Sequence, residues 1–295
     1  MIMADLVNKA REYTSSVQNE RLAVLGEDWV PTDQVESDLV LTSPPQHSFP
    51  GMLISAGLMT WYVIRAPTSG GTTFRVINSQ DGYEPTAVQA GTIMRLSPRF
   101  TDRMIFNHVN DQIMAMGSPL HGLYAVHTWQ SEVNLVNQMY DIPVEIEGFT
   151  SVSSIRYRPS GQTEDWREIR KFDVHRTDGN GQIRVYENVH HGWLEFTVRM
   201  PFARAAYLTD NPVTACGLTE SMLDIPPLGA AGILLQSEEG RRLSLQAQGD
   251  PRRSEESPPT GFATQGREFT RIRDQRIRAE AAKMASLYSY QLRVV

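Results

Sequence analysis

The hydrophobic pattern of this chain changes its period several times, and this change constrains the fold more than any other feature. Apolar residues recur at helical spacing near the start of the chain, over 101–116 and over 267–290. Over 26–98 and 139–207, short alternating runs rich in β-branched and aromatic residues are separated by Gly and Pro. Helices have a period of 3.6 and strands a period of two, so the sequence predicts helices that alternate with two separate groups of strands.

Amphipathic helices that are scattered along a chain must bury their apolar stripes against something. We therefore expect an α+β fold with a helical bundle core and two antiparallel β-domains, each a small barrel or sandwich, inserted into it. The expected domains are a helical core of 1–25, 99–138 and 208–290, a first β-domain of 26–98, a second β-domain of 139–207, and a C-terminal partner-binding tail of 291–295.

Two of the helical segments carry the clearest apolar stripes. In each, apolar side chains recur at steps of three or four residues and so fall on one face of a helix. We expect this face to form the helical core, through Ile105, Val109, Ile113, Ile277, Ala281 and Met284.

Composition excludes several classes of protein. The 295 residues include 28 Lys and Arg against 34 Asp and Glu, a net charge of -6, whereas proteins that read nucleic-acid sequence usually carry a basic surface. A single cysteine, Cys216, excludes an intrachain disulfide framework and any multi-cysteine metal site. No apolar run approaches the ~20 residues that span a bilayer, and no signal peptide is evident. We expect no membrane partner and folding in a reducing cytosol.

Residues that carry metal or nucleophilic chemistry do not form a recognisable site in this sequence. His190 and His191 are adjacent, so in a strand they would point to opposite faces. A calcium loop that began at Asp178 would need Glu at its twelfth position, which is Val189. Cys216 has no recognisable nucleophile context, and a small buried residue is the simpler interpretation. We expect no metal, cofactor or catalytic residue.

Two further possibilities remain open from the residues alone. The arginines of the last helix could contact phosphate, although interleaved acidic residues favour a solvated or subunit-facing surface. A hydrolase that uses His175 or His191 with a carboxylate of the second β-domain is the least favoured hypothesis, because no nucleophile elbow, dinucleotide fingerprint or phosphate loop is present.

Several segments resemble the head-to-tail connector (adaptor) proteins of tailed bacteriophages. Segment 52–63 (MLISAGLMTWYV) resembles their paired strands around a glycine, although Leu58 stands where their pattern has Glu. Segment 91–101 (GTIMRLSPRFT) resembles their strand that ends in Pro-Arg-Phe before a helix, which here reaches Asn110-Asp111. The block that starts at Asp224-Ile225-Pro226 and continues to the long last helix also resembles these adaptors.

This resemblance implies a structural protein of the virion neck that is made in the host cytoplasm. Such a protein forms a ring of about twelve copies of itself, as closed cyclic oligomers do through head-to-tail contacts. The helices that carry Ile105, Val109, Ile113, Ile277, Ala281 and Met284 would form the body of this ring. Its partners would be the portal protein and a downstream stopper or tail-terminator protein, and DNA would pass through without being read. A minor tail or baseplate protein is the alternative within the virion.

The last residues of the chain read as a short strand. An extended segment can add to the sheet of a partner through its backbone donors and acceptors, and we expect that partner to be the portal. The expected interface residues are Tyr288, Tyr290, Leu292, Arg293, Val294 and Val295.

Overall fold

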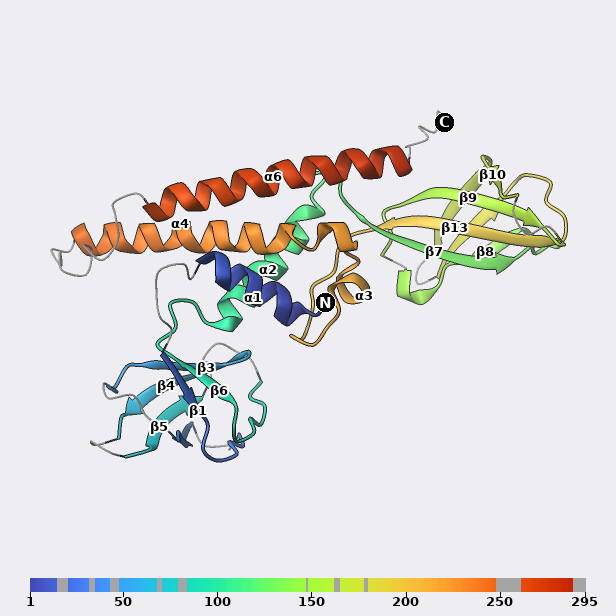
Figure 1. The fold of residues 1–295 in the computed structure, drawn as a ribbon. Helices are drawn as coiled ribbons and strands as arrows, with labels where there is room; N and C mark the ends of the chain where they lie inside the picture. Colours follow the sequence, from blue (N-terminus) through green and yellow to red (C-terminus); the bar gives the residue numbers. More distant parts are fainter. Residues whose placement is uncertain are drawn as a thin grey trace. The chain divides into compact units, whose positions relative to one another are not determined.

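The computed structural model describes residues 1–14, 21–31, 35–42, 48–67, 71–78, 84–146, 148–161, 165–177, 180–247 and 261–288. Helices accompany three antiparallel sheets of six, four and three strands, so the predicted α+β class is confirmed (Figure 1). The chain divides into two compact units. Unit 1 comprises 1–112, 205–210 and 224–273, and unit 2 comprises 113–204, 211–223 and 274–295.

The six-stranded sheet lies in unit 1. Its strands follow the spatial order β1-β6-β3-β4-β5-β2, and all neighbours are antiparallel. A tight turn at Gly57, which has a positive φ of 54°, joins β3 to β4. The strand bounds are β1 Arg21–Val24, β2 Glu36–Val40, β3 Leu53–Ala56, β4 Met59–Arg65, β5 Thr73–Asn78 and β6 Ile93–Leu96.

One face of this sheet encloses a hydrophobic core. Trp61 and Phe74 are fully buried, and the ring of Trp29 meets Trp61 edge-on with centroids 5.3 Å apart. The indole N–H of Trp29 donates to Ser37 Oγ at 3.1 Å, and Ser37 in turn donates to Asn78. This buried polar atom therefore has a partner inside an otherwise apolar interior.

The prediction of a barrel is wrong for the described residues. The edge strands β1 and β2 meet only at one isolated bridge between Leu25 and Leu41, where the Gly26 N–H donates to the Val40 carbonyl at 2.8 Å. One bridge does not make a ladder, so these six strands form an open sheet that curls until its edges touch at one point.

The helices of unit 1 come from both ends of the sequence. They are α1 (Met3–Thr14), the first part of α2 (Asp102–Met116), α4 (Ile225–Ala247) and the first half of α6 (Gly261–Leu287). Helix α1 packs along α4, and Tyr13 of α1 meets Phe269 of α6 with ring centroids 5.2 Å apart. Segments more than 200 residues apart in the chain therefore share one interior.

Helices α4 and α6 approach each other closely at two glycines, and Figure 1 shows them side by side. A Cβ on Gly266 would lie 2.8 Å from the carbonyl oxygen of Gly232, and a Cβ on Gly232 would lie 3.0 Å from the carbonyl oxygen of Gly266. Because backbone atoms cannot move aside cheaply, both positions require glycine despite its poor helix propensity.

Substitution Gly266→Ala should lower the free energy of unfolding by about 1–3 kcal/mol, because overpacking outweighs the gain of about 1 kcal/mol in helix propensity. Urea denaturation measures the change. The control is Thr264→Ala at an exposed position of the same helix, which should leave stability unchanged or raise it slightly. A Gly266→Ala protein as stable as the parent would contradict the close packing.

A buried ionic cluster joins β6 to α1 and α2. Asp102, in the first turn of α2, accepts a hydrogen bond from Arg11 of α1 and lies 3.7 Å from Arg95 of β6. The side chains of Arg11 and Asp102 are only 9% and 13% exposed. Loss of the carboxylate would leave two guanidinium groups without its charge in a poorly solvated site.

We therefore expect Asp102→Asn to destabilise the chain by about 3 kcal/mol, the cost of breaking a buried ion pair. Thermal and urea unfolding of the variant check this value. Asp165→Asn removes the same charge from an exposed residue and should change stability by no more than about 0.5 kcal/mol. Equal losses in both variants would mean that the cluster contributes only through net charge.

Unit 2 contains the other two sheets. The four-stranded sheet has the order β10-β9-β13-β7 and the three-stranded sheet the order β11-β12-β8. The strand bounds are β7 Ala125–Glu132, β8 Met139–Asp141, β9 Ser151–Pro159, β10 Arg167–Ile169, β11 Phe172–Thr177, β12 Asn180–Val185 and β13 Gly192–Met200. The short helices are η1 Val144–Ile146, α3 Pro212–Cys216 and η2 Glu220–Met222.

Both sheets of unit 2 contribute to one hydrophobic cluster. Phe196 of β13 stacks on Trp129 of β7 with centroids 4.8 Å apart, and Tyr140 of β8 lies 5.3 Å from Phe196. Ile155 of the four-stranded sheet and Ile183 of the three-stranded sheet are fully buried in the same cluster. The two sheets therefore bury their inner faces together.

One strand of unit 2 lies where the sequence analysis expected the helical core. Strand β7 falls within 99–138, and it pairs with β13 along its whole length. The preceding helix, α2, occupies the segment predicted for it. Strands β11 and β12 pair antiparallel as far as Thr177 and Asn180, and residues 178 and 179 lie outside the described residues. Among the described helices, none is long and apolar enough to cross a membrane.

Candidate functional site

The six residues predicted for the helical core lie on α2 and α6. Ile105, Val109 and Ile113 are fully buried on α2. On α6, Ile277 and Met284 are buried and Ala281 is half-buried. These side chains pack inside the single chain, so they build its interior. Their place in a ring body stays a prediction.

The second half of α6 borders a hollow of about 480 Å³ in unit 2. One wall is formed by Met284 and Leu287 of α6 and the other by Leu218, Met222 and the segment between them. Val126, at the start of β7, also lines it. The hollow is mostly apolar, with a small group of charged and hydroxyl side chains at one side.

That polar group is centred on Glu280, whose side chain is 8% exposed. Ser221 Oγ donates to Glu280 Oε2 at 2.9 Å, and Lys283 Nζ lies 3.6 Å from the same oxygen. Arg276 donates to the Ser221 carbonyl at 2.9 Å and lies 3.5 Å from Glu280 Oε1. These contacts fasten α6 to the η2 segment. No pattern in the sequence predicts this contact, because Ser221 and Glu280 are 59 residues apart in the chain.

The far end of α6 is held by an arginine of the four-stranded sheet. Arg199 of β13 donates to the carbonyl of Tyr288 at 3.0 Å, and its guanidinium lies 4.3 Å from the ring centroid of Tyr124. Burial raises the pKa of the Tyr124 hydroxyl above its usual value, while the nearby Arg199 charge acts in the opposite direction. Tyr288 is half-buried, and the other expected interface residues, Tyr290, Leu292, Arg293, Val294 and Val295, lie outside the described residues.

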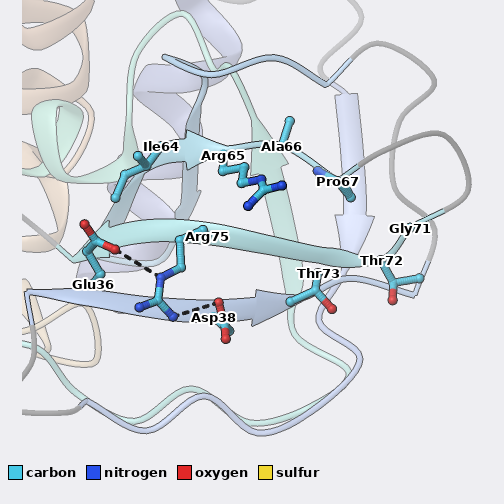
Figure 2. Close-up of a pocket in the computed structure, with 10 residues that line it drawn as sticks. All are labelled: Glu36, Asp38, Ile64, Arg65, Ala66, Pro67, Gly71, Thr72, Thr73 and Arg75. Atoms are coloured by element: carbon cyan, nitrogen blue, oxygen red, sulfur yellow. Dashed lines mark hydrogen bonds and ion pairs between the residues drawn. The ribbon is translucent and has the colours of Figure 1, made fainter.

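The second hollow, of about 730 Å³, lies over strands β2, β4 and β5 of unit 1 (Figure 2). Arg75 donates to Glu36 Oε2 and to Asp38 Oδ1, each at 3.1 Å. The hydrogen bond to Asp38, followed by that to Glu36, raises the pKa of the Arg75 guanidinium. All three side chains are well exposed, so these ion pairs orient Arg75 but contribute little stability.

Neither hollow contains a recognisable catalytic arrangement among its described lining residues. The hollow of Figure 2 offers the hydroxyls of Thr72 and Thr73 but no His or Cys, and both of its carboxylates bind Arg75. The hollow beside α6 has one carboxylate, and Ser221, Arg276 and Lys283 surround it. The arrangement is therefore suited to holding elements together.

None of the described residues considered for chemistry in the sequence lines either of these hollows. His190 and His191 are exposed in the loop before β13, where the His190 N–H donates to the Tyr157 hydroxyl at 3.3 Å. Cys216 is buried at the end of α3. Over the part of the chain that the structure describes, no group of three His, Cys, Asp or Glu residues could hold a metal ion.

Substitution Glu280→Gln should lower stability by about 2–3 kcal/mol, because a buried charge-assisted network loses its anion. Glu268→Gln is the matched control. Glu268 pairs with Arg271 on the exposed face of the same helix, and loss of that pair should cost about 0.5 kcal/mol or less. Urea unfolding of both variants compares them. Similar effects for the two substitutions would show that the Glu280 network does not fasten α6.

No family model, curated protein or solved structure matches this chain.

Proposed function

We propose that this chain is a structural head-to-tail adaptor of a tailed phage, which forms a ring of its own copies between capsid and tail. The helical interior of unit 1 carries the proposal. There α1 packs along α4, and Tyr13 contacts Phe269 of α6, so segments from both ends of the chain share one interior. In the sequence, one β-module is inserted between α1 and α2 and the other between α2 and α3. A helical core with two inserted β-domains is the finer architecture that we propose.

Exposed apolar side chains support a role in assembly. Leu22 and Val24 of β1 and Ile93 of β6 are 56%, 38% and 59% exposed. Val24 and Ile93 are directly opposite one another in the β1–β6 ladder, and Leu22 lies on the same face two residues before Val24. Contiguous apolar surface of this kind commonly marks a contact with another protein.

The charge of the chain supports a passage for DNA that does not bind it. Each copy carries a net charge of -6, and a ring multiplies this charge around its axis. Acidic surfaces repel phosphate, so DNA can move through such a ring without being held or read. The proposed partners are the portal protein on one side and a stopper or tail-terminator protein on the other, in the neck of the virion.

The mass of the protein, alone and mixed with the portal protein of the same virus, tests this proposal. We expect the mixed sample to contain a complex whose mass exceeds that of the portal by about twelve copies of a 33.2 kDa chain. Negative-stain images should show rings that cap the portal end-on.

A matched pair of variants tests whether the apolar surface of β1 and β6 takes part. Ile93→Lys places a charge in the exposed patch and should weaken portal-bound ring formation at least tenfold, whereas Glu84→Lys makes a charge change at an exposed residue outside the patch and should not. A protein that binds only a tail or baseplate component, with no complex on the portal, would replace the adaptor by the minor tail or baseplate alternative.

A further inference from the structure

Strand β7 (Ala125–Glu132) is an edge strand of the four-stranded sheet, and it pairs on one side only, with β13. The Val133 N–H donates to the carbonyl of Gly192 directly opposite it. Hydrogen-bonded and non-hydrogen-bonded pairs alternate along an antiparallel ladder. The backbone groups of Val126, Thr128, Gln130 and Glu132 therefore point away from β13, toward the open side.

The open side of β7 is accessible. His127, Thr128, Gln130 and Glu132 are exposed, and in the described part of the chain no backbone hydrogen bond joins the outward N–H groups of this strand to another element. Eight residues of strand extend about 26 Å, at about 3.3 Å per residue. The edge is therefore long enough to accept a whole additional strand.

The sequence of β7 contains none of the usual protections against edge pairing. Soluble proteins guard long edges with Lys, Pro, bulges or a short strand. Strand β7 has no Lys, Arg, Pro or Gly, its ladder with β13 has no register shift, and its single acidic residue, Glu132, is at the end. The opposite edge of the same sheet differs, because β10 has only three residues, two of them Arg167 and Glu168.

We propose that the edge of β7 accepts residues 290–295 of a second copy of this chain as a fifth strand. This segment, which we call the arm, has the sequence YQLRVV, with strand-forming residues and a length of about 20 Å when extended. The last described residue before it, Tyr288, is fixed by Arg199, and Arg199 is opposite Val126 in the β7–β13 ladder. Tyr288 therefore lies beside the surface to which a neighbour's arm would add.

The choice of a second copy rests on the proposed ring. A ring closes only through heterologous contacts, in which one surface of each copy binds a different surface of the next. An arm on the neighbour's β7 is such a contact. Pairing of two β7 edges would be isologous and would stop at a dimer, and an arm folded onto its own β7 would join no copies. The arm then links copies of the ring, in place of the portal contact that the sequence suggested.

Cysteine cross-linking of the full chain tests this pairing. Two double variants, Thr128→Cys with Gln291→Cys and Thr128→Cys with Leu292→Cys, sample neighbouring registers on the exposed face of β7. Under a mild oxidant and without portal, we expect covalent dimers and larger covalent oligomers, which a reducing agent converts back to monomers. The control pair, Glu168→Cys with Gln291→Cys, places the first cysteine on the other edge of the same sheet and should give no covalent oligomers.

The alternative results separate this inference from the adaptor proposal. Disulfide formation within single chains, detected as loss of free thiols at monomer mass, would place the arm on its own β7. Absence of cross-links in both double variants would show that the arm does not bind this edge. If rings form on the portal but no covalent oligomers form, this inference fails while the adaptor proposal stands. Covalent oligomers of a protein that never forms a closed ring would support the strand pairing and contradict the adaptor proposal.

A proline variant tests the role of the backbone directly. Thr128→Pro removes an N–H that points to the open side, so it should preserve the ladder with β13 and reduce self-association at least tenfold. Thr128→Val retains the N–H and should leave both unchanged. Circular dichroism and the melting temperature establish that both variants fold. Self-association of Thr128→Pro at the level of Thr128→Val would contradict strand addition.

Discussion

The close contact between the backbones of α4 and α6 at Gly232 and Gly266 is the constraint on which unit 1 depends. Two helices whose carbonyl oxygens lie this near to the position of a Cβ on the opposite glycine leave no room for side chains between them. Tyr13 and Phe269 can then meet while α1 also packs along α4. A helix pair with larger residues at the contact would stand 8–10 Å apart or more, as ordinary packing requires. The three helices would then no longer fit around one interior.

Buried carboxylates serve the same purpose in both units. Asp102 in unit 1 and Glu280 in unit 2 each contact two cationic side chains. The cations around Asp102 come from α1 and β6, and Glu280 also accepts a hydrogen bond from Ser221 of η2, so each carboxylate fixes the position of one element against another. Such clusters add little net stability over apolar packing, but they penalise any arrangement that separates their members. Charged clusters therefore fix the relative positions of neighbouring elements within each unit, while apolar side chains fill the interior.

The sequence predicts a helix where its apolar residues recur at helical spacing and are buried. Ile105, Val109 and Ile113 recur every four residues, and all three are buried. The sequence predicts that α6 begins at 267, whereas the helix begins at Gly261, because glycine is a poor helix former and only the contact with α4 explains the glycine at position 266. Strand β7 was missed because its sequence, AVHTWQSE, lacks a regular apolar alternation. Its strand conformation comes from pairing with β13, which no local pattern reveals.

The edge strands of the three sheets differ in length and charge, and this difference supports the edge of β7 as the proposed interface. In unit 1 the two edge strands converge on the bridge between Leu25 and Leu41. In unit 2, β8 and β10 have three residues each, and β11 carries Asp173 and Arg176 among its six. Short or charged edges discourage pairing with other chains. Strand β7 has neither property, and a chain that leaves one edge long and nearly uncharged, while its other edges are short or charged, retains a place where another strand can bind.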